Sequence, residues 1–298
     1  MNDYLWDRSG PEDPEIAELE RALAPLAHRG APPRVRRVRL RPLAIAAGAL
    51  LAIGGALLLR GGSVPPAPLE GPPLRVAATG ATLLPGAWIE ARETEHELFL
   101  GDVGRITLRL GSRMQVRALG DETTRLFLAR GALEASIAAD ARPRFFQVDT
   151  DAARCVDLGC RYTLEVDDAG DARVDVTFGQ VAFETETREV YVPRGAVCLA
   201  KRGRGPGTPR FKDSAPALAA ALDAYDAAPA ESRLEAARAA LALVERPRDT
   251  LAAWHFLQDA DAAVARAAEA RLAEVAGRPE GDAPNREAWK AHLEAGWW

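Results

Sequence analysis

A long middle stretch of the chain alternates between apolar and polar residues, the pattern of strands that bury one face. This alternation runs from about Leu74 to Ala200, and short turns rich in glycine and aspartate interrupt it. Residues 105–110 and 114–117 alternate on either side of Gly111 and Ser112, which predicts a tight hairpin between them. We expect about ten to twelve short strands in an all-β antiparallel sandwich or roll.

After Ser214 the apolar positions change to the period of helices. Pro216 marks a helix start, Gly277 marks a stop, and Asn285 is a further start signal. The spacing predicts an α-helical tail over residues 214–298, which resembles one or two pairs of HEAT-type helices. This tail either packs onto the β domain or offers a surface to another protein.

Residues 1–41 are too few for an ordinary globular core, yet they carry one helical signal. One face of this predicted helix carries a narrow apolar seam whose residues recur at spacings of three and four: Ile16, Leu19, Leu23 and Leu26. The aromatic residue Trp6 precedes the seam and is a further candidate for contact with a partner. A single helix leaves such a seam uncovered. The seam either packs at a membrane surface or on a second copy, or it docks into a groove of a cytoplasmic partner.

A run without charged or strongly polar residues begins at Pro42 and ends at Leu59. As a helix it would span about 27 Å, close to the thickness of a bilayer core. A signal peptide would need a cleavage site of small residues, and a buried soluble helix would hold fewer Ala and Gly residues. The run therefore predicts a transmembrane helix over residues 42–60. Small residues at spacing four would let two such helices pack as a homodimer; these are Ala44, Gly48, Ala52 and Ala56.

The charges indicate how this helix would be oriented. The chain of 298 residues has a formal net charge of -5, but five arginines lie between Arg34 and Arg41. Basic residues beside a span stay in the cytoplasm, so we expect the N-terminus inside and the C-terminus in the periplasm. The acidic total argues against direct binding of nucleic acid. A linker rich in Pro and Gly, residues 61–73, would separate the span from a β domain over residues 74–213.

Candidate chemistry changes this picture little. The sequence contains no nucleophile elbow, zinc-protease motif or Walker loop, so we expect no enzyme and no cofactor. The four histidines are scattered, and no paired ligand spacing accompanies the cysteines, which argues against a metal site. In an oxidising compartment Cys155 and Cys160 could form a disulfide; alternatively, they and Cys198 are buried thiols.

The order of the strands resembles the FecR domain family, from Gly104 onward. Gly131 with Glu134 is similar to the family's Gly-Glu-Ala-type turn. Residues 144–150 (RFFQVDT) resemble its Pro-Phe-x-Val-x-Thr strand, and residues 158–164 (LGCRYTL) resemble its Leu-Gly-Thr-x-Phe-x-Val strand. Residues 174–183 correspond to its closing hairpin. Cys160 stands where the family usually has Thr.

The resemblance implies a single-pass, anti-sigma-factor-like regulator in the inner (cytoplasmic) membrane. Such a protein would contact the lipid bilayer and sense a periplasmic or outer-membrane protein partner. It would modulate an extracytoplasmic-function sigma factor through the seam in residues 1–41. The alternative is a membrane-anchored periplasmic scaffold, or a module that binds polysaccharide or protein, without contact to a sigma factor.

Overall fold

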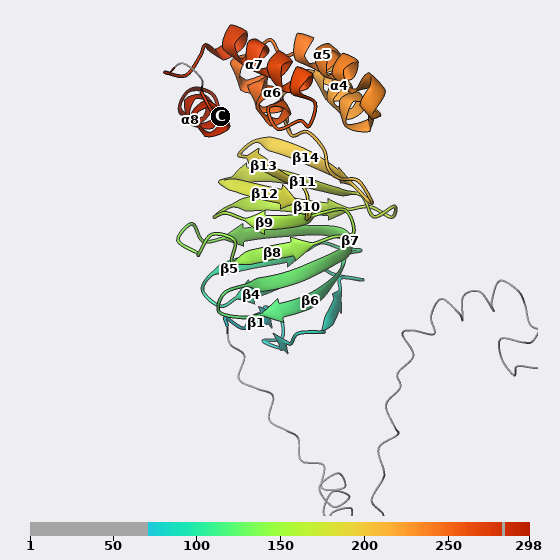
Figure 1. The fold of residues 1–298 in the computed structure, drawn as a ribbon. Coiled ribbons are helices and arrows are strands. Elements are labelled where there is room, and N and C mark those ends of the chain that lie inside the picture. Colours follow the sequence, from blue (N-terminus) through green and yellow to red (C-terminus); the bar gives the residue numbers. More distant parts are fainter. Residues whose placement is uncertain (1–70, 282–283) are drawn as a thin grey trace, which may run out of the picture. The chain divides into compact units, whose positions relative to one another are not determined.

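The computed structural model describes residues 71–281 and 284–298 (Figure 1). All described residues belong to one compact unit of the chain. This unit contains a large β-sheet followed by a helical region.

Sixteen strands form one continuous sheet, because the longest of them, β7 (Thr124–Ile137), pairs within both of its halves. Up to Arg130, β7 pairs with β6 and β8; from Gly131 onward it pairs with β5 and β10. Gly131 has a φ of 84°, in the left-handed region that favours glycine. The strand therefore changes partners at this residue. We call the half beyond Gly131 sheet I and the half before it sheet II.

Each sheet extends outward from its part of β7. The other strands of sheet I are β1 (Leu74–Val76), β2 (Thr82–Leu83), β4 (His96–Leu100), β5 (Gly104–Leu108), β10 (Arg161–Val166), β11 (Ala172–Phe178), β14 (Ala196–Lys201), β15 (Gly205–Pro206) and β16 (Arg210–Phe211). The other strands of sheet II are β3 (Trp88–Glu90), β6 (Arg113–Leu119), β8 (Phe146–Asp149), β9 (Arg154–Asp157), β12 (Gln180–Glu184) and β13 (Glu189–Pro193). Neighbouring strands run antiparallel except β7 and β8, which are parallel.

The alternation in the sequence explains where the core lies. Leu126, Val148 and Phe183 face inward from sheet II, and Leu133 and Leu164 face inward from sheet I. All five are fully buried and belong to one hydrophobic cluster. Burying such a side chain stabilises the fold by about 1.5–3 kcal/mol. The side chains between them face outward and form the two surfaces described below.

Two hairpins predicted from the sequence are wrong, and for the same reason. Strands β5 and β6 belong to different sheets, as do β11 and β12. A glycine with positive φ lies between the strands of each pair: Gly111 at 81° and Gly179 at 68°. At both places the chain passes from one sheet to the other instead of folding back on itself. Alternation predicts a strand, but it does not say which strand will lie beside it.

Five α-helices follow the sheet in the part of the chain that the structure describes. They are α4 (Pro216–Ala227), α5 (Arg233–Ala242), α6 (Thr250–Phe256), α7 (Ala262–Ala276) and α8 (Arg286–Gly296), with short 3-10 turns at Ala230–Ser232 and Pro247–Asp249. Side chains of Asp261 and Asn285 accept hydrogen bonds that cap α7 and α8. The apolar faces form a second hydrophobic cluster, which includes Trp254 and Trp289. The helical period predicted after Ser214 is thus confirmed.

The helical region packs against the edge of sheet II at Tyr191 of β13. The His255 Nε2 lies 2.9 Å from the Tyr191 carbonyl oxygen, and the Glu294 Oε1 lies 2.5 Å from its hydroxyl. The ring of Trp254 meets the ring of Tyr191 edge-on at 5.9 Å between centroids. An edge strand presents unpaired backbone groups, so this contact covers a surface that would otherwise be open to association.

The predicted fold class needs a correction, because it included a transmembrane helix. Among the described residues, no helix is both long and apolar enough to cross a membrane. The longest, α7, has 15 residues and carries charged side chains, whereas a span needs about 20 apolar residues. Residues 42–60, for which the span was predicted, lie outside the described residues. What the structure describes is a large, mostly antiparallel sheet and a C-terminal helical region.

Candidate partner-binding face

One row of cross-strand neighbours runs across the whole outward face of sheet II. Its members come from β3, β6, β7, β8, β9, β12 and β13 in turn: Trp88, Gln115, Phe127, Asp149, Arg154, Glu184 and Glu189. Side chains of a strand alternate between its two faces, so these seven share the face opposite the core. We call them the sheet II row. It is aromatic at one end and charged at the other.

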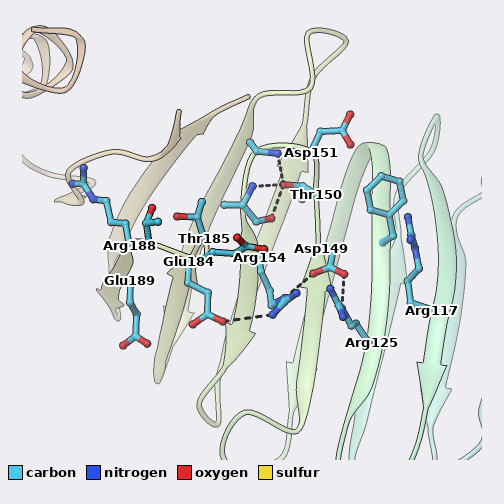
Figure 2. A pocket seen from close by; sticks show the side chains of 15 residues that line it. Arg117, Arg125, Asp149, Thr150, Asp151, Arg154, Glu184, Thr185, Arg188 and Glu189 are labelled. Atoms are coloured by element: carbon cyan, nitrogen blue, oxygen red, sulfur yellow. Dashed lines mark hydrogen bonds and ion pairs between the residues drawn. The ribbon is translucent and has the colours of Figure 1, made fainter. Parts of the chain in front are cut away.

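The charged end is a ladder of ion pairs (Figure 2). Asp149 accepts hydrogen bonds from Arg125 Nε at 2.5 Å and from Arg154 Nε at 2.7 Å. Glu184 lies 3.9 Å from Arg154 Nη1 and accepts a hydrogen bond from Arg144 Nη2 at 2.6 Å. The two carboxylate side chains are only 17% and 14% exposed. Each carboxylate therefore lies between two guanidinium groups in a partly desolvated position, where ion pairs are screened less than on an open surface.

Arg144 reaches this ladder from the loop before β8. Its φ is 67°, unusual for a residue other than glycine. Two hydrogen bonds hold the backbone there: its N–H donates to the Asp157 carbonyl at 2.9 Å, and its carbonyl accepts from Gln147 Nε2 at 3.0 Å. The hydrogen bond to Glu184 raises the pKa of Arg144, so its charged form is favoured. The loop thus delivers a fixed positive charge to the edge of the face.

At the aromatic end, two aromatic rings and two guanidinium groups contact one another and so hold a defined geometry. The rings of Trp88 and Phe127 lie nearly perpendicular, with their centroids 6.3 Å apart. The guanidinium of Arg113 lies 4.2 Å from the Trp88 ring, and that of Arg117 lies 4.5 Å from the Phe127 ring. Trp88 is 44% exposed. Tryptophan and arginine are the residues that most often anchor protein–protein interfaces, so this end fits that use.

A cleft of about 910 Å³ opens along the row, between the turns at residues 150–153 and 185–188. Its floor carries the Asp149 and Arg154 side chains, which Figure 2 shows pointing toward one another. The Thr150 hydroxyl is engaged within its own turn, where it donates to the Ala153 carbonyl at 2.7 Å. In the described part of the chain no group of three or more His, Cys, Asp or Glu could hold a metal ion. The arrangement suits recognition of a partner that carries both charges.

The three cysteines are free and buried. Of the two arrangements that the sequence left open, the structure has buried thiols and not a Cys155–Cys160 disulfide. The Cys160 thiol donates to Asp157, whose carboxylate also accepts the backbone N–H groups of Gly159 and Cys160. Burial raises the pKa of both the Cys155 and Cys160 thiols, which keeps them protonated.

The binding residues predicted from the sequence lie outside the described residues. These are Trp6, Ile16, Leu19, Leu23 and Leu26 for a cytoplasmic partner, and Ala44, Gly48, Ala52 and Ala56 for helix packing. They stay predictions. The sequence did not predict the sheet II row, because its members are spread from residue 88 to residue 189 and only the pairing of the strands brings them together. The alternation of Arg113, Gln115 and Arg117 with buried Met114 and Val116 was a local signal for one strand of the face, but not for its neighbours.

Comparison with known proteins tests the predicted resemblance to the FecR domain. Residues 89–182 match the model of a family described as FecR protein. The predicted resemblance is confirmed over these residues, which are similar to the FecR domain. The match begins at Ile89, earlier than the expected Gly104, and includes the middle of the sheet II row. The resemblance of the helical region to HEAT repeats stays a prediction.

No curated protein matches the chain. Two crystal structures of a candidate anti-sigma factor from Parabacteroides distasonis are similar to it. In both cases the identity is 15%, and the alignment covers 43% of this chain and 60% of that chain, with a TM-score of 0.37. The chain therefore spans about 60% of the length of those proteins. A likeness at this level carries no argument about fold or function.

Replacing Asp149 with alanine is expected to lower the free energy of unfolding by about 2 kcal/mol, because it leaves two guanidinium groups without their shared carboxylate. Glu165→Ala is the matched control, since Glu165 forms an exposed pair with Arg173, with side chains 50% and 42% exposed. That control is expected to lose less than about 0.5 kcal/mol. Urea denaturation of both variants measures the difference. Equal losses would contradict a special role for the ladder.

Proposed function

We propose that this protein is a regulator whose FecR domain recognises a partner protein and whose N-terminal segment controls an extracytoplasmic-function sigma factor. The observation that carries the proposal is the sheet II row within and beside the FecR domain. It combines an anchor of the exposed Trp88 and the half-buried Phe127 with a ladder of ion pairs. An interface of this kind binds through central aromatic anchors and gains specificity from the charges around them.

The charges of the row indicate the kind of partner. Arg113 and Arg117 lie at its aromatic end and form no ion pair among the described residues, whereas Arg144 pairs with both Glu184 and Glu189 at the other end. A periplasmic or outer-membrane protein with an acidic patch beside an apolar pocket would complement the aromatic end of this face. A basic patch in that position would be repelled by Arg113 and Arg117, so the charges favour an acidic partner.

Control of a sigma factor requires two states with different affinity for it. The apolar seam of Ile16, Leu19, Leu23 and Leu26 is the segment we assign to that contact, because a helix with one narrow apolar stripe suits a groove on a soluble protein. Binding of a partner on the sheet II row would then change the availability of the seam. The expected localisation at the inner membrane remains part of the same proposal.

Capture of sigma factors by the purified full-length chain tests this function. We expect the wild-type chain to retain one extracytoplasmic-function sigma factor of its host, and a variant with all four seam residues changed to alanine to lose it. A Trp88→Ala/Phe127→Ala variant should retain the sigma factor, yet abolish the response of a reporter gene that this factor transcribes. Failure to capture any sigma factor, or capture unaffected by the seam substitutions, would overturn the proposal.

A further inference from the structure

A second row of cross-strand neighbours lies on the outward face of sheet I. Its members come from β4, β5, β7, β10 and β11 in turn: Phe99, Arg105, Ser136, Arg161 and Phe178. We call it the sheet I row. Its order is symmetric, with a serine at the centre, an arginine on each side and a phenylalanine at each end. All five residues line one cleft of about 840 Å³.

The two phenylalanines at its ends are exposed instead of packed in the core. Phe99 is 37% exposed and Phe178 is 53% exposed. They are four strands apart, or about 19 Å at the usual spacing of strands. The two arginines are two strands apart, about 10 Å by the same spacing. The cleft thus presents two flat apolar rings with a pair of guanidinium groups between them.

The charges inside the cleft leave one arginine available. The Arg105 guanidinium lies 5.4 Å from the centre of the Phe99 ring and forms an ion pair of 3.1 Å with Glu97. Glu134 is held by Arg109 and not by the row. Asp102 also lines the cleft.

Arg161 has no carboxylate within ion-pair distance in the described part of the chain. Its Nε instead lies 3.4 Å from Ser136 Oγ. An exposed guanidinium beside a hydroxyl is a site ready for an anion, since its planar fork matches a carboxylate with two parallel hydrogen bonds.

We propose that the sheet I row binds an acidic polysaccharide, a polyuronate that lies across the strands. The Phe99 and Phe178 rings would stack on the C–H faces of sugars at the two ends. Between them Arg161 would pair with one carboxylate, and Arg105, which pairs with Glu97 through Nη1, would offer its remaining N–H groups to a second. In an extended polyuronate, carboxylates of alternate sugars lie on one side, a repeat that suits the separation of the arginines.

Two features favour a polysaccharide over an acidic peptide. The cleft lies on the face of a sheet, where the backbone groups of β5, β7 and β10 are already paired with each other. A peptide recognised by a sheet usually gains its affinity by pairing with an edge strand, which this face does not offer. The floor of the cleft carries the hydroxyls of Ser136 and Thr107, which suit the hydroxyl groups of sugars.

This site is independent of the proposed sigma-factor contact, since it shares no residue with the sheet II row or the apolar seam. Binding of the full-length chain to polygalacturonate, measured by titration calorimetry, tests it. Dextran is the neutral control, poly-glutamate tests an acidic peptide, and oligothymidylate tests a nucleic acid. We expect binding to polygalacturonate that weakens with salt, no binding to dextran, and weaker binding to the other two polyanions.

Arg161→Ala and Phe178→Ala should each weaken polygalacturonate binding by about tenfold, the loss expected for one charge-assisted hydrogen bond or one stacking contact. Arg113→Ala is the matched control: it removes an arginine stacked on an aromatic ring of sheet II and should leave the affinity unchanged. Circular dichroism verifies that each variant is folded. The proposal is overturned if polygalacturonate does not bind, if poly-glutamate or oligothymidylate binds as tightly, or if Arg113→Ala weakens binding as much as Arg161→Ala.

Discussion

Replacing Gly131 with alanine is expected to lower the free energy of unfolding by about 3 kcal/mol or more, from backbone strain and overpacking together. Gly131 has a φ of 84°, which a residue with a Cβ rarely adopts. A Cβ there would lie 2.5 Å from the Cα of Ser112 and 2.3 Å from its Oγ, and backbone cannot move aside cheaply. Because β7 changes partners at this residue, the substitution would strain both sheets. Denaturation in guanidinium chloride measures the loss.

Gly111→Ala is the matched control for this prediction. Gly111 has nearly the same φ, 81°, but a Cβ there would meet nothing within 4 Å. It should therefore lose only the conformational part, about 1 kcal/mol. If the two substitutions cost the same, the close approach of Ser112 to β7 contributes nothing to the fold.

Acidification below about pH 6.5 is expected to destabilise the contact between the helical region and sheet II through His255. Burial lowers the pKa of His255 from 6.5 to about 3, and the nearby Arg286 and Arg188 act in the same direction. As the pH falls, the unfolded state therefore takes up this proton before the folded state does. The contribution of His255 to stability is complete above pH 6.5 and is lost by up to about 1.4 kcal/mol per pH unit toward pH 3.

Comparison with His255→Gln isolates this effect from that of other titrating groups. The glutamine amide can still donate a hydrogen bond toward the Tyr191 carbonyl, but it does not titrate. Urea denaturation at pH 7.5, 6 and 5 should show a steeper fall for the wild type than for the variant. Parallel curves would mean that His255 is protonated as easily in the folded protein as in the unfolded chain.

The contact at Tyr191 also has a consequence for the candidate partner-binding face. Glu189, the last member of the sheet II row, and Tyr191 lie on the same short strand, β13. The helices hold this strand from its outer edge through His255 and Glu294. A partner that bound the row would therefore contact the strand on which the helical region rests, so the His255 substitution also reports on how firmly the end of the row is held.

Much of the secondary structure could be predicted from the sequence alone. Strict alternation, as in residues 162–166, identifies strands and separates core residues from outward ones, because burial of one face is a local property of the pattern. The helical period after Ser214 and the caps at Asp261 and Asn285 are equally local. The FecR resemblance also rested on residues close in sequence, and the family match confirms it.

The two binding rows and the strand order were decided only by the tertiary structure. The sequence suggested that strands on either side of Gly111 would pair, whereas each found its neighbours in different halves of β7. The order of the strands across the sheet depends on which buried side chains pack together although they are far apart in the sequence. The local period carries no information about that choice. Arg161 lies opposite Ser136, and Trp88 shares a row with Glu189, because of this non-local packing. The sequence by itself determined which side chains face solvent; the packed core determined which of them meet.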